Sequence, residues 1–231
     1  MKLKRIGLLF LTFAFFSLQL QSKDNNIKVI FFDFGGFAID QKPLLKRLAD
    51  YFAPGANISS FSDKGIMRYL KEDLRMSKLK IMCKSPKLWR MTTEHIEKTK
   101  IFDNVKNVLQ ELSSRGYSIK VLSSIAKEKI ENKLDQEGLK DVVECISSGS
   151  LINAFLKRKA IIKKYLKSQK LAPNQALYIG DEVSKVKVYQ KVGVKICAIS
   201  WGLSSKVSLL QGKPNFLIDK PEELLGILQK V

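Results

Sequence analysis

Two acids and a serine lie at positions where a carboxylate or a hydroxyl could take part in catalysis or binding. Each follows or ends a short apolar run: Asp33 ends IKVIFFD, Ser123 follows YSIKVL, and Asp181 follows ALYIG. A carboxylate can attack an electrophile or bind a hard cation, and a hydroxyl can donate a hydrogen bond to an anion. Taken alone, Asp33 also fits a second interpretation, in which a strand ends in a turn and the acid is a solvated cap.

The apolar runs predict the strands that carry these three residues. From residue 102 onward, runs rich in β-branched and aromatic residues alternate with helical patterns. This alternation predicts an α/β fold, a Rossmann-like parallel sheet with helices on both faces. Right-handed crossovers place the carboxyl ends of all strands at one edge of such a sheet. We therefore expect Asp33, Ser123 and Asp181 to lie at the same edge.

Residues 42–100 lack a strand pattern. Apolar residues recur there at helical spacing in three segments, at 43–53, from about Ser62, and after Pro86. Such spacing predicts amphipathic helices. The expected organisation is a core domain of residues 23–41 and 101–231, interrupted by a small all-α cap at 42–100.

The first residues differ in character from the rest. Lys2, Lys4 and Arg5 precede an uncharged apolar segment at 6–20, which has the length of the apolar region of a secretory signal. We expect residues 1–22 to be a signal peptide cleaved after Ser22 or an uncleaved anchor, with a hydrophobic first helix as the other alternative. The first two predict a protein exported to the periplasm or secreted, or held to the membrane only by this segment.

Composition limits the classes of protein. The 231 residues are 45% hydrophobic and 27% charged, which is typical of one globular α/β domain with a small insertion. The net charge of +19 favours anionic partners, but the lysines are spread along the chain without an arginine cluster, so no specific nucleic-acid binding is expected. Three cysteines without a C-x-x-C spacing argue against a disulfide framework or a zinc site. The single histidine, His95, has no obvious partner in the sequence.

The order of these features resembles a known superfamily. A strand ends in Asp33-x-Gly-Gly, a helical insertion follows, a second strand leads to Ser123, a lysine occurs near 157, and a later strand leads to Gly-Asp-Glu at 180–182. This order resembles the haloacid dehalogenase-like hydrolases, in the branch with a small helical cap. The resemblance runs from about residue 27 to 231 and implies a phosphatase that acts on a small phosphate monoester.

The resemblance also implies roles for individual residues. Asp33 would attack phosphorus and form an aspartyl-phosphate, and Ser123 would hydrogen-bond the phosphoryl group. Lys157, or alternatively Lys159, would neutralise charge between nucleophile and phosphate. Substrate contacts and a Mg²⁺ site complete the implied set: Gly36 and Ser124 for the substrate; Asp33, Asp181 and the backbone carbonyl of Gly35 for the metal.

Three positions depart from the family pattern. Gly35 stands where the family has a second Asp, the general acid and base, and Phe37 stands where it has a Thr. Lys185 replaces an acid in the fourth motif. Near Asp181, its ammonium would compete with Mg²⁺ for that carboxylate. Lys185 could swing out to solvent and leave weak Mg²⁺ binding, could substitute for the charge of the metal, or could mark a dead site.

These departures leave more than one function open. The first is a phosphatase with impaired or unusual catalysis. The second is a catalytically inactive relative that binds a phosphorylated ligand or a protein partner. Metal-free dehalogenases of the superfamily also lack the second acid, but the Gly-Asp-Glu at 180–182 favours phosphate chemistry. The sequence does not predict the identity of the substrate or the oligomeric state.

Overall fold

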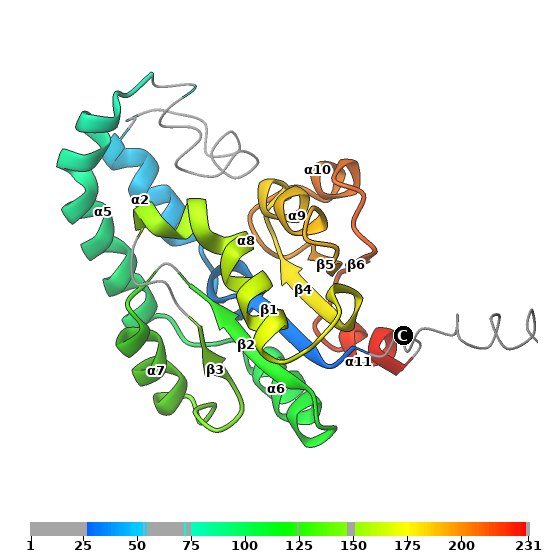
Figure 1. Ribbon diagram of the computed structural model, residues 1–231. Coiled ribbons are helices and arrows are strands. Elements are labelled where there is room, and N and C mark those ends of the chain that lie inside the picture. Colours follow the sequence, from blue (N-terminus) through cyan, green and yellow to red (C-terminus); the bar gives the residue numbers. More distant parts are fainter. Residues whose placement is uncertain are drawn as a thin grey trace, which may run out of the picture.

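The computed structural model describes residues 27–52, 54, 72, 75–123, 125–146 and 151–229. Within them, strands form one parallel sheet in the order β3-β2-β1-β4-β5-β6 (Figure 1). The strands are β1 (Val29–Asp33), β2 (Ser118–Leu122), β3 (Glu144–Cys145), β4 (Ala176–Gly180), β5 (Lys195–Ile199) and β6 (Phe216–Ile218). The predicted parallel α/β sheet is confirmed.

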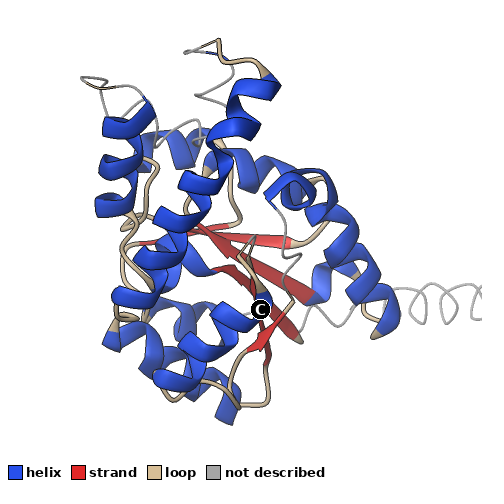
Figure 2. Cartoon of the chain, turned by 90° about the vertical axis from the view of Figure 1, so that its left-hand side faces the viewer, coloured by secondary structure: helices blue, strands red, loops and turns tan. Residues whose placement is uncertain are grey.

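Helices cover both faces of this sheet (Figure 2). Ile30 and Phe32 of β1 pack on one face, with apolar side chains of α6 (Asp103–Ser114), α7 (Lys127–Gln136) and α11 (Glu223–Gln229). Val29 and Phe31 pack on the other face, with α8 (Leu151–Ser168) and α9 (Val183–Gln190). Because successive strand residues point to opposite faces, β1 is apolar throughout, as expected for a central strand.

The register of the sheet brings the predicted residues to one edge. In β1, Asp33 pairs with Leu122 of β2, and Phe32 pairs with Ile179 of β4. Ser123 and Asp181 therefore follow the last paired residues of the two strands that flank Asp33. In Figure 1 the strand arrows point toward the side of the molecule where α2 (Lys42–Phe52) and α5 (Lys78–Lys98) lie.

Helices α2 and α5 pack against each other and have a small core of their own. It comprises Leu44, Leu48, Phe52, Met76, Leu88 and Met91. The sequence predicted that the last helix of the insertion follows Pro86, but α5 begins at Lys78 and contains this proline. A proline removes one backbone donor, and the packing of Leu88 and Met91 in this core offsets that loss. The helix predicted from Ser62 lies outside the described residues.

Two further boundaries differ from prediction. The apolar run at 142–146 predicts a strand, which is reduced to Glu144–Cys145 in the structure. The helical pattern at about 158–169 predicts a helix, which begins at Leu151. Among the described residues no helix is long and apolar enough to cross a membrane. The predicted signal or anchor at 1–22 lies outside these residues. Cys145 and Cys197 are buried free thiols, and burial raises the pKa of Cys197.

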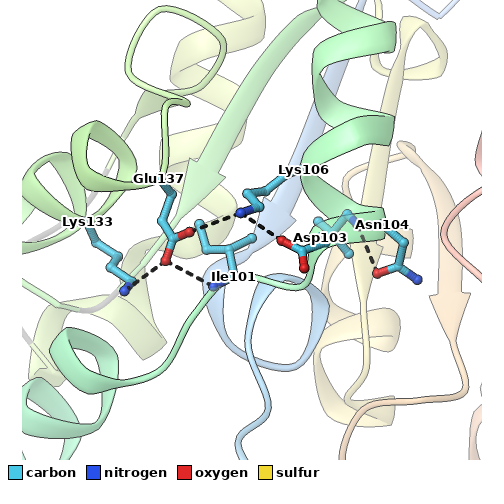
Figure 3. Close-up of polar contacts among 7 residues, drawn as sticks. Ile101, Asp103, Asn104, Lys106, Lys133 and Glu137 are labelled. Atoms are coloured by element: carbon cyan, nitrogen blue, oxygen red, sulfur yellow. Dashed lines mark hydrogen bonds and ion pairs between the residues drawn. The ribbon is translucent and has the colours of Figure 1, made fainter.

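Glu137, just after α7, joins three segments of the core (Figure 3). Its Oε1 accepts hydrogen bonds from Lys133 Nζ at 3.0 Å and from the Ile101 N–H at 3.3 Å. Its Oε2 accepts from Lys106 Nζ at 3.3 Å, and Lys106 also pairs with Asp103 at 2.8 Å. Burial would raise the pKa of Glu137, but the donors, first among them Lys133, outweigh it, and the pKa is lowered.

Candidate active site

Asp33 is a buried and paired carboxylate at the carboxyl end of the central strand. Its side chain is 5% exposed. The Tyr178 hydroxyl donates to Oδ2 at 2.6 Å, and Lys185 Nζ lies 2.7 Å from the same oxygen. The interpretation of Asp33 as a solvated cap is therefore wrong, because the packing of β1 between two helical layers removes it from water.

Lys185 has different ion-pair partners from the one expected. It lies on α9, one turn after Glu182, and its Nζ is 2.5 Å from Glu182 Oε1 in addition to its contact with Asp33. The sequence predicted that this ammonium would lie near Asp181 and pair with that carboxylate. The helix geometry instead directs it across the strand ends to Asp33, and Asp181 feels its charge without an ion pair being formed in the described structure. Glu182 is thus a partner of Lys185, and its side chain does not cap α9.

Asp181 is fully buried and incompletely satisfied. Its Oδ2 accepts a hydrogen bond from the Leu203 N–H at 3.0 Å, and its Oδ1 has no hydrogen-bond partner among the described residues. Burial raises the pKa of Asp181 to about 7; the ammonium of Lys185 opposes this rise, and the charges of Glu182 and Asp33 add to it. A buried orphan carboxylate oxygen is costly and is a feature of functional sites rather than of structural ones.

Two glycines make room for Asp181. Gly36 has a φ of +81°, and a Cβ there would lie 2.1 Å from Asp181 Oδ2. A Cβ on Gly202 would lie 2.2 Å from Asp181 Cβ. The turn η1 (Phe34–Ala38) and the loop after β5 therefore close on this carboxylate from two directions. The substrate contact predicted for Gly36 stays a prediction.

Tyr178 is a site residue that the sequence reasoning missed. It is fully buried on β4, and its ring crosses Gly180, where a Cβ would lie 2.5 Å from the hydroxyl oxygen. The signal was present: a tyrosine in an otherwise aliphatic buried strand needs a partner for its hydroxyl. Gly180 lets that hydroxyl reach Asp33 on the neighbouring strand.

Gly35 leaves space that the side chain of Gln41 occupies. Gly35 has ordinary extended backbone angles, φ −78° and ψ 146°, so its conformation does not require glycine. However, a Cβ at this position would lie 1.4 Å from Gln41 Nε2 and 2.1 Å from its Cδ. The carboxamide of Gln41 thus fills the space in which a side chain at position 35 would begin.

Phe37 belongs to the core. It is fully buried, with its ring 5.1 Å from that of Phe32 and 6.2 Å from that of Trp201. The indole N–H of Trp201 donates to the Phe37 carbonyl at 3.4 Å. This position stabilises the turn after β1 by packing and offers no side-chain hydrogen bond to a ligand.

The remaining predicted residues lie on elements that start at the same edge. Ser123 Oγ accepts a hydrogen bond from the Ile125 N–H at 3.0 Å. Lys157 and the half-buried Lys159 lie on α8, which follows the carboxyl end of β3. Ser124 and the side chain of Lys157 lie outside the described part, so their roles stay predictions.

In the structure, His95 has a hydrogen-bond partner in the backbone. Its Nε2 donates to the Asp40 carbonyl at 2.6 Å, and the Thr99 hydroxyl lies 3.3 Å from Nδ1. These contacts tie the last turns of α5 to the segment before α2. The sequence alone did not reveal this pairing, because 55 residues separate His95 from Asp40.

Known proteins resemble this chain over most of its length. Residues 30–199 match the family model described as haloacid dehalogenase-like hydrolase, so the chain belongs to this family. A phosphoglycolate phosphatase of Synechococcus elongatus is 24% identical over 207 residues, which are 86% of this chain and 96% of that protein. The pyrophosphatase PpaX of Bacillus cereus (strain Q1) is 27% identical over 134 residues, 58% of this chain and 62% of that protein.

Solved structures share the fold. A predicted phosphatase from Clostridium acetobutylicum has a TM-score of 0.76 at 16% identity, with 89% of this chain and 100% of that chain covered. A haloacid dehalogenase-like hydrolase from Streptococcus pneumoniae has a TM-score of 0.68 at 21% identity, with 87% and 98% covered. These similarities concern the fold alone.

The side chains, as placed, do not fit the Mg²⁺ ion that the family implies. Mg²⁺ prefers near-octahedral oxygen ligands. Asp33 Oδ2 instead receives Lys185 and Tyr178, and Asp181 Oδ1 is a single unpartnered oxygen. Within the described ranges, no three His, Cys, Asp or Glu side chains converge as a metal cluster.

Proposed function

We propose that this chain is a phosphatase that hydrolyses a small phosphate monoester through an aspartyl-phosphate on Asp33. The observation that carries the proposal is the position of Asp33, a buried carboxylate at the end of the central strand with two donors on one oxygen. These donors fix the orientation of the carboxylate, and a fixed nucleophile is what covalent catalysis requires. The relative named as a phosphoglycolate phosphatase supports this choice of chemistry.

The reaction has two steps. A carboxylate oxygen of Asp33 attacks phosphorus, the bond from phosphorus to the leaving oxygen breaks, and the leaving group takes a proton. Water then attacks the aspartyl-phosphate, which releases inorganic phosphate and restores Asp33. Ser123 and Ser124 would hydrogen-bond the phosphoryl group together with the backbone at Gly36, and Lys157 or Lys159 would offset its charge.

Position 35 offers no side chain that could transfer a proton to the leaving group. Gly35 has no acid, and the carboxamide of Gln41 in its place can donate a hydrogen bond but cannot exchange a proton. General acid–base help is worth roughly 10²–10⁴ in rate. Protonation of the leaving group would then depend on solvent, so aryl phosphates, whose leaving groups need little help, should be better substrates than alkyl phosphates.

An assay of the full chain with an aryl phosphate tests this proposal. Turnover that disappears in Asp33→Asn, while Asp50→Asn on the exposed side of α2 retains it, is the expected result. Turnover unchanged in Asp33→Asn would refute the nucleophile. Thermal unfolding of each variant separates a lost nucleophile from a lost fold.

A second candidate function is binding without catalysis. The observation that favours it is the ion pair between Lys185 and Asp33, which ties up the oxygen that a nucleophile would use. In that case the chain would bind a phosphorylated ligand or a protein partner. No turnover by a folded chain, together with stabilisation by inorganic phosphate, would support this function over the first.

The domain division and the location of the protein are also proposals. The separate core of α2 and α5 supports a cap at 42–100 within a core domain of 23–41 and 101–231. The sequence of residues 1–22 supports export, with cleavage after Ser22 or retention as an anchor. The N-terminal residue of the exported protein would distinguish cleavage from anchoring.

A further inference from the structure

The side chain of Lys185 ends between two acids of the site, Asp33 and Glu182. Its Nζ is 2.7 Å from Asp33 Oδ2 and 2.5 Å from Glu182 Oε1, and the three side chains are 16%, 5% and 14% exposed. Asp181, fully buried, feels the charges of all three. Among the described side chains, the Lys185 ammonium therefore pairs with two carboxylates and acts on the charge of a third in a site with little water.

We propose that the Lys185 ammonium is the resident cation of this site and takes the place that a divalent metal ion would hold at Asp33. A metal ion bound to Asp33 Oδ2 would lie within about 4 Å of this ammonium, where repulsion between the charges lowers metal affinity by well over tenfold. A metal ion could bind that oxygen only after Lys185 had moved away.

Two features of the surroundings hold Lys185 in this position. Glu182 lies just before α9, three residues before Lys185. The ion pair with Glu182 therefore holds the Lys185 ammonium next to the helix that carries it. Tyr178 donates to the same oxygen of Asp33 at 2.6 Å, which holds that oxygen facing the ammonium of Lys185 at 2.7 Å. An anchored ammonium loses little entropy on pairing, unlike a long side chain at the surface.

Mg²⁺ binding by the full chain tests this inference without a measurement of activity. Thermal unfolding and calorimetry would compare wild type, Lys185→Met, and the control Lys187→Met, an exposed lysine on the same helix. We expect wild type and Lys187→Met not to respond to Mg²⁺ up to about 10 mM, whereas Lys185→Met binds at least about tenfold more tightly and unfolds at a higher temperature.

Two outcomes would overturn the inference. One is Mg²⁺ binding by wild type as tight as that by Lys185→Met; the other is a folded Lys185→Met that does not bind Mg²⁺ either. If Lys185→Met does not fold, Lys185→Gln replaces it, and submillimolar binding of Mg²⁺ by wild type decides against the inference by itself.

An activity measurement extends the test and rests on the proposed function. Aryl phosphatase turnover by wild type should be the same in EDTA and in Mg²⁺. A chain with no turnover under either condition contradicts the phosphatase proposal, whereas the Mg²⁺ titrations still decide the role of Lys185. Turnover abolished by EDTA and restored by Mg²⁺ contradicts the role of Lys185 and leaves the phosphatase proposal intact.

Discussion

Two partly buried networks of lysines and acids in this molecule are built in opposite ways. Around Glu137, three donors, from Lys133, Lys106 and the Ile101 backbone, serve one carboxylate, and its pKa is lowered. At the sheet edge, two described carboxylates, Asp33 and Glu182, share the ammonium of Lys185, and burial raises the pKa of Asp181 to about 7.

The difference distinguishes a structural network from a functional one. Every oxygen of Glu137 has a donor, so this network closes the junction between α6, α7 and the segment that leaves the insertion (Figure 3). Asp181 has a buried oxygen without a partner in the described structure. A buried carboxylate oxygen without a partner is more typical of a residue that takes part in binding or catalysis than of one that stabilises the fold.

The largest expected effect comes from adding the general acid that position 35 lacks. Gly35→Asp alone should disturb the turn, because its Cβ overlaps Gln41, but Gly35→Asp with Gln41→Ala removes that overlap. The double variant should hydrolyse alkyl phosphates faster than wild type, by up to roughly 10²–10⁴ if the new acid reaches the leaving group. Steady-state kinetics on alkyl and aryl phosphates provide the measurement. Gln41→Ala is the control, and equal rates in the double variant and in Gln41→Ala would contradict this account of position 35.

A second comparison isolates the contact between Gly36 and Asp181. Gly36 and Gly116 have nearly the same φ, +81° and +85°, but a Cβ on Gly116 would meet nothing within 4 Å. Both alanine variants carry backbone strain of about 1–2 kcal/mol, and only Gly36→Ala also displaces Asp181. We expect Gly36→Ala to lower the free energy of unfolding by about 2 kcal/mol more than Gly116→Ala. Denaturant unfolding measures both, and equal losses would show that Asp181 does not depend on Gly36.

The hydroxyl of Tyr178 should matter for catalysis more than for the fold. Tyr178→Phe removes a donor to Asp33, and we expect kcat to fall by about tenfold, the value of one charged hydrogen bond, with KM little changed. Tyr117→Phe removes a part-buried hydrogen bond to the Leu228 carbonyl and serves as the control. A Tyr178→Phe enzyme with the kcat of wild type would mean that the Tyr178 hydroxyl does not orient the nucleophile.

The smallest effect concerns the Glu137 network and depends on pH. A pKa lowered on folding gives stability that is present above the unfolded pKa, ordinarily 4.5, and is lost as the pH falls through the lower folded value. Glu137→Gln should therefore cost about 1 kcal/mol at pH 7, and the difference from wild type should shrink as the pH falls below 4.5. Urea unfolding at several pH values measures this difference. A difference that is independent of pH would show that packing, and not charge, is lost.

Local pattern predicted the strands, because an apolar run of β-branched and aromatic residues is a property of the few residues within it. The turns and the parallel topology then restricted Asp33, Ser123 and Asp181 to one edge, and the register of β1 with its neighbours confirms that arrangement. The end of α5 nearest Pro86 was placed wrongly, since a local rule about proline does not include the core formed with α2.

The sequence by itself therefore determined the sheet, its order of motifs, and the acids at the carboxyl edge. Only the tertiary structure decided which side chains those acids contact. Tyr178 reaches Asp33 across 145 residues, Lys185 turns to Asp33 rather than to Asp181, and Gln41 fills the space beside Gly35. The physical reason is that strand propensity depends on residues near in sequence, whereas a hydrogen bond a few ångströms long depends on the packing of elements far apart in the chain.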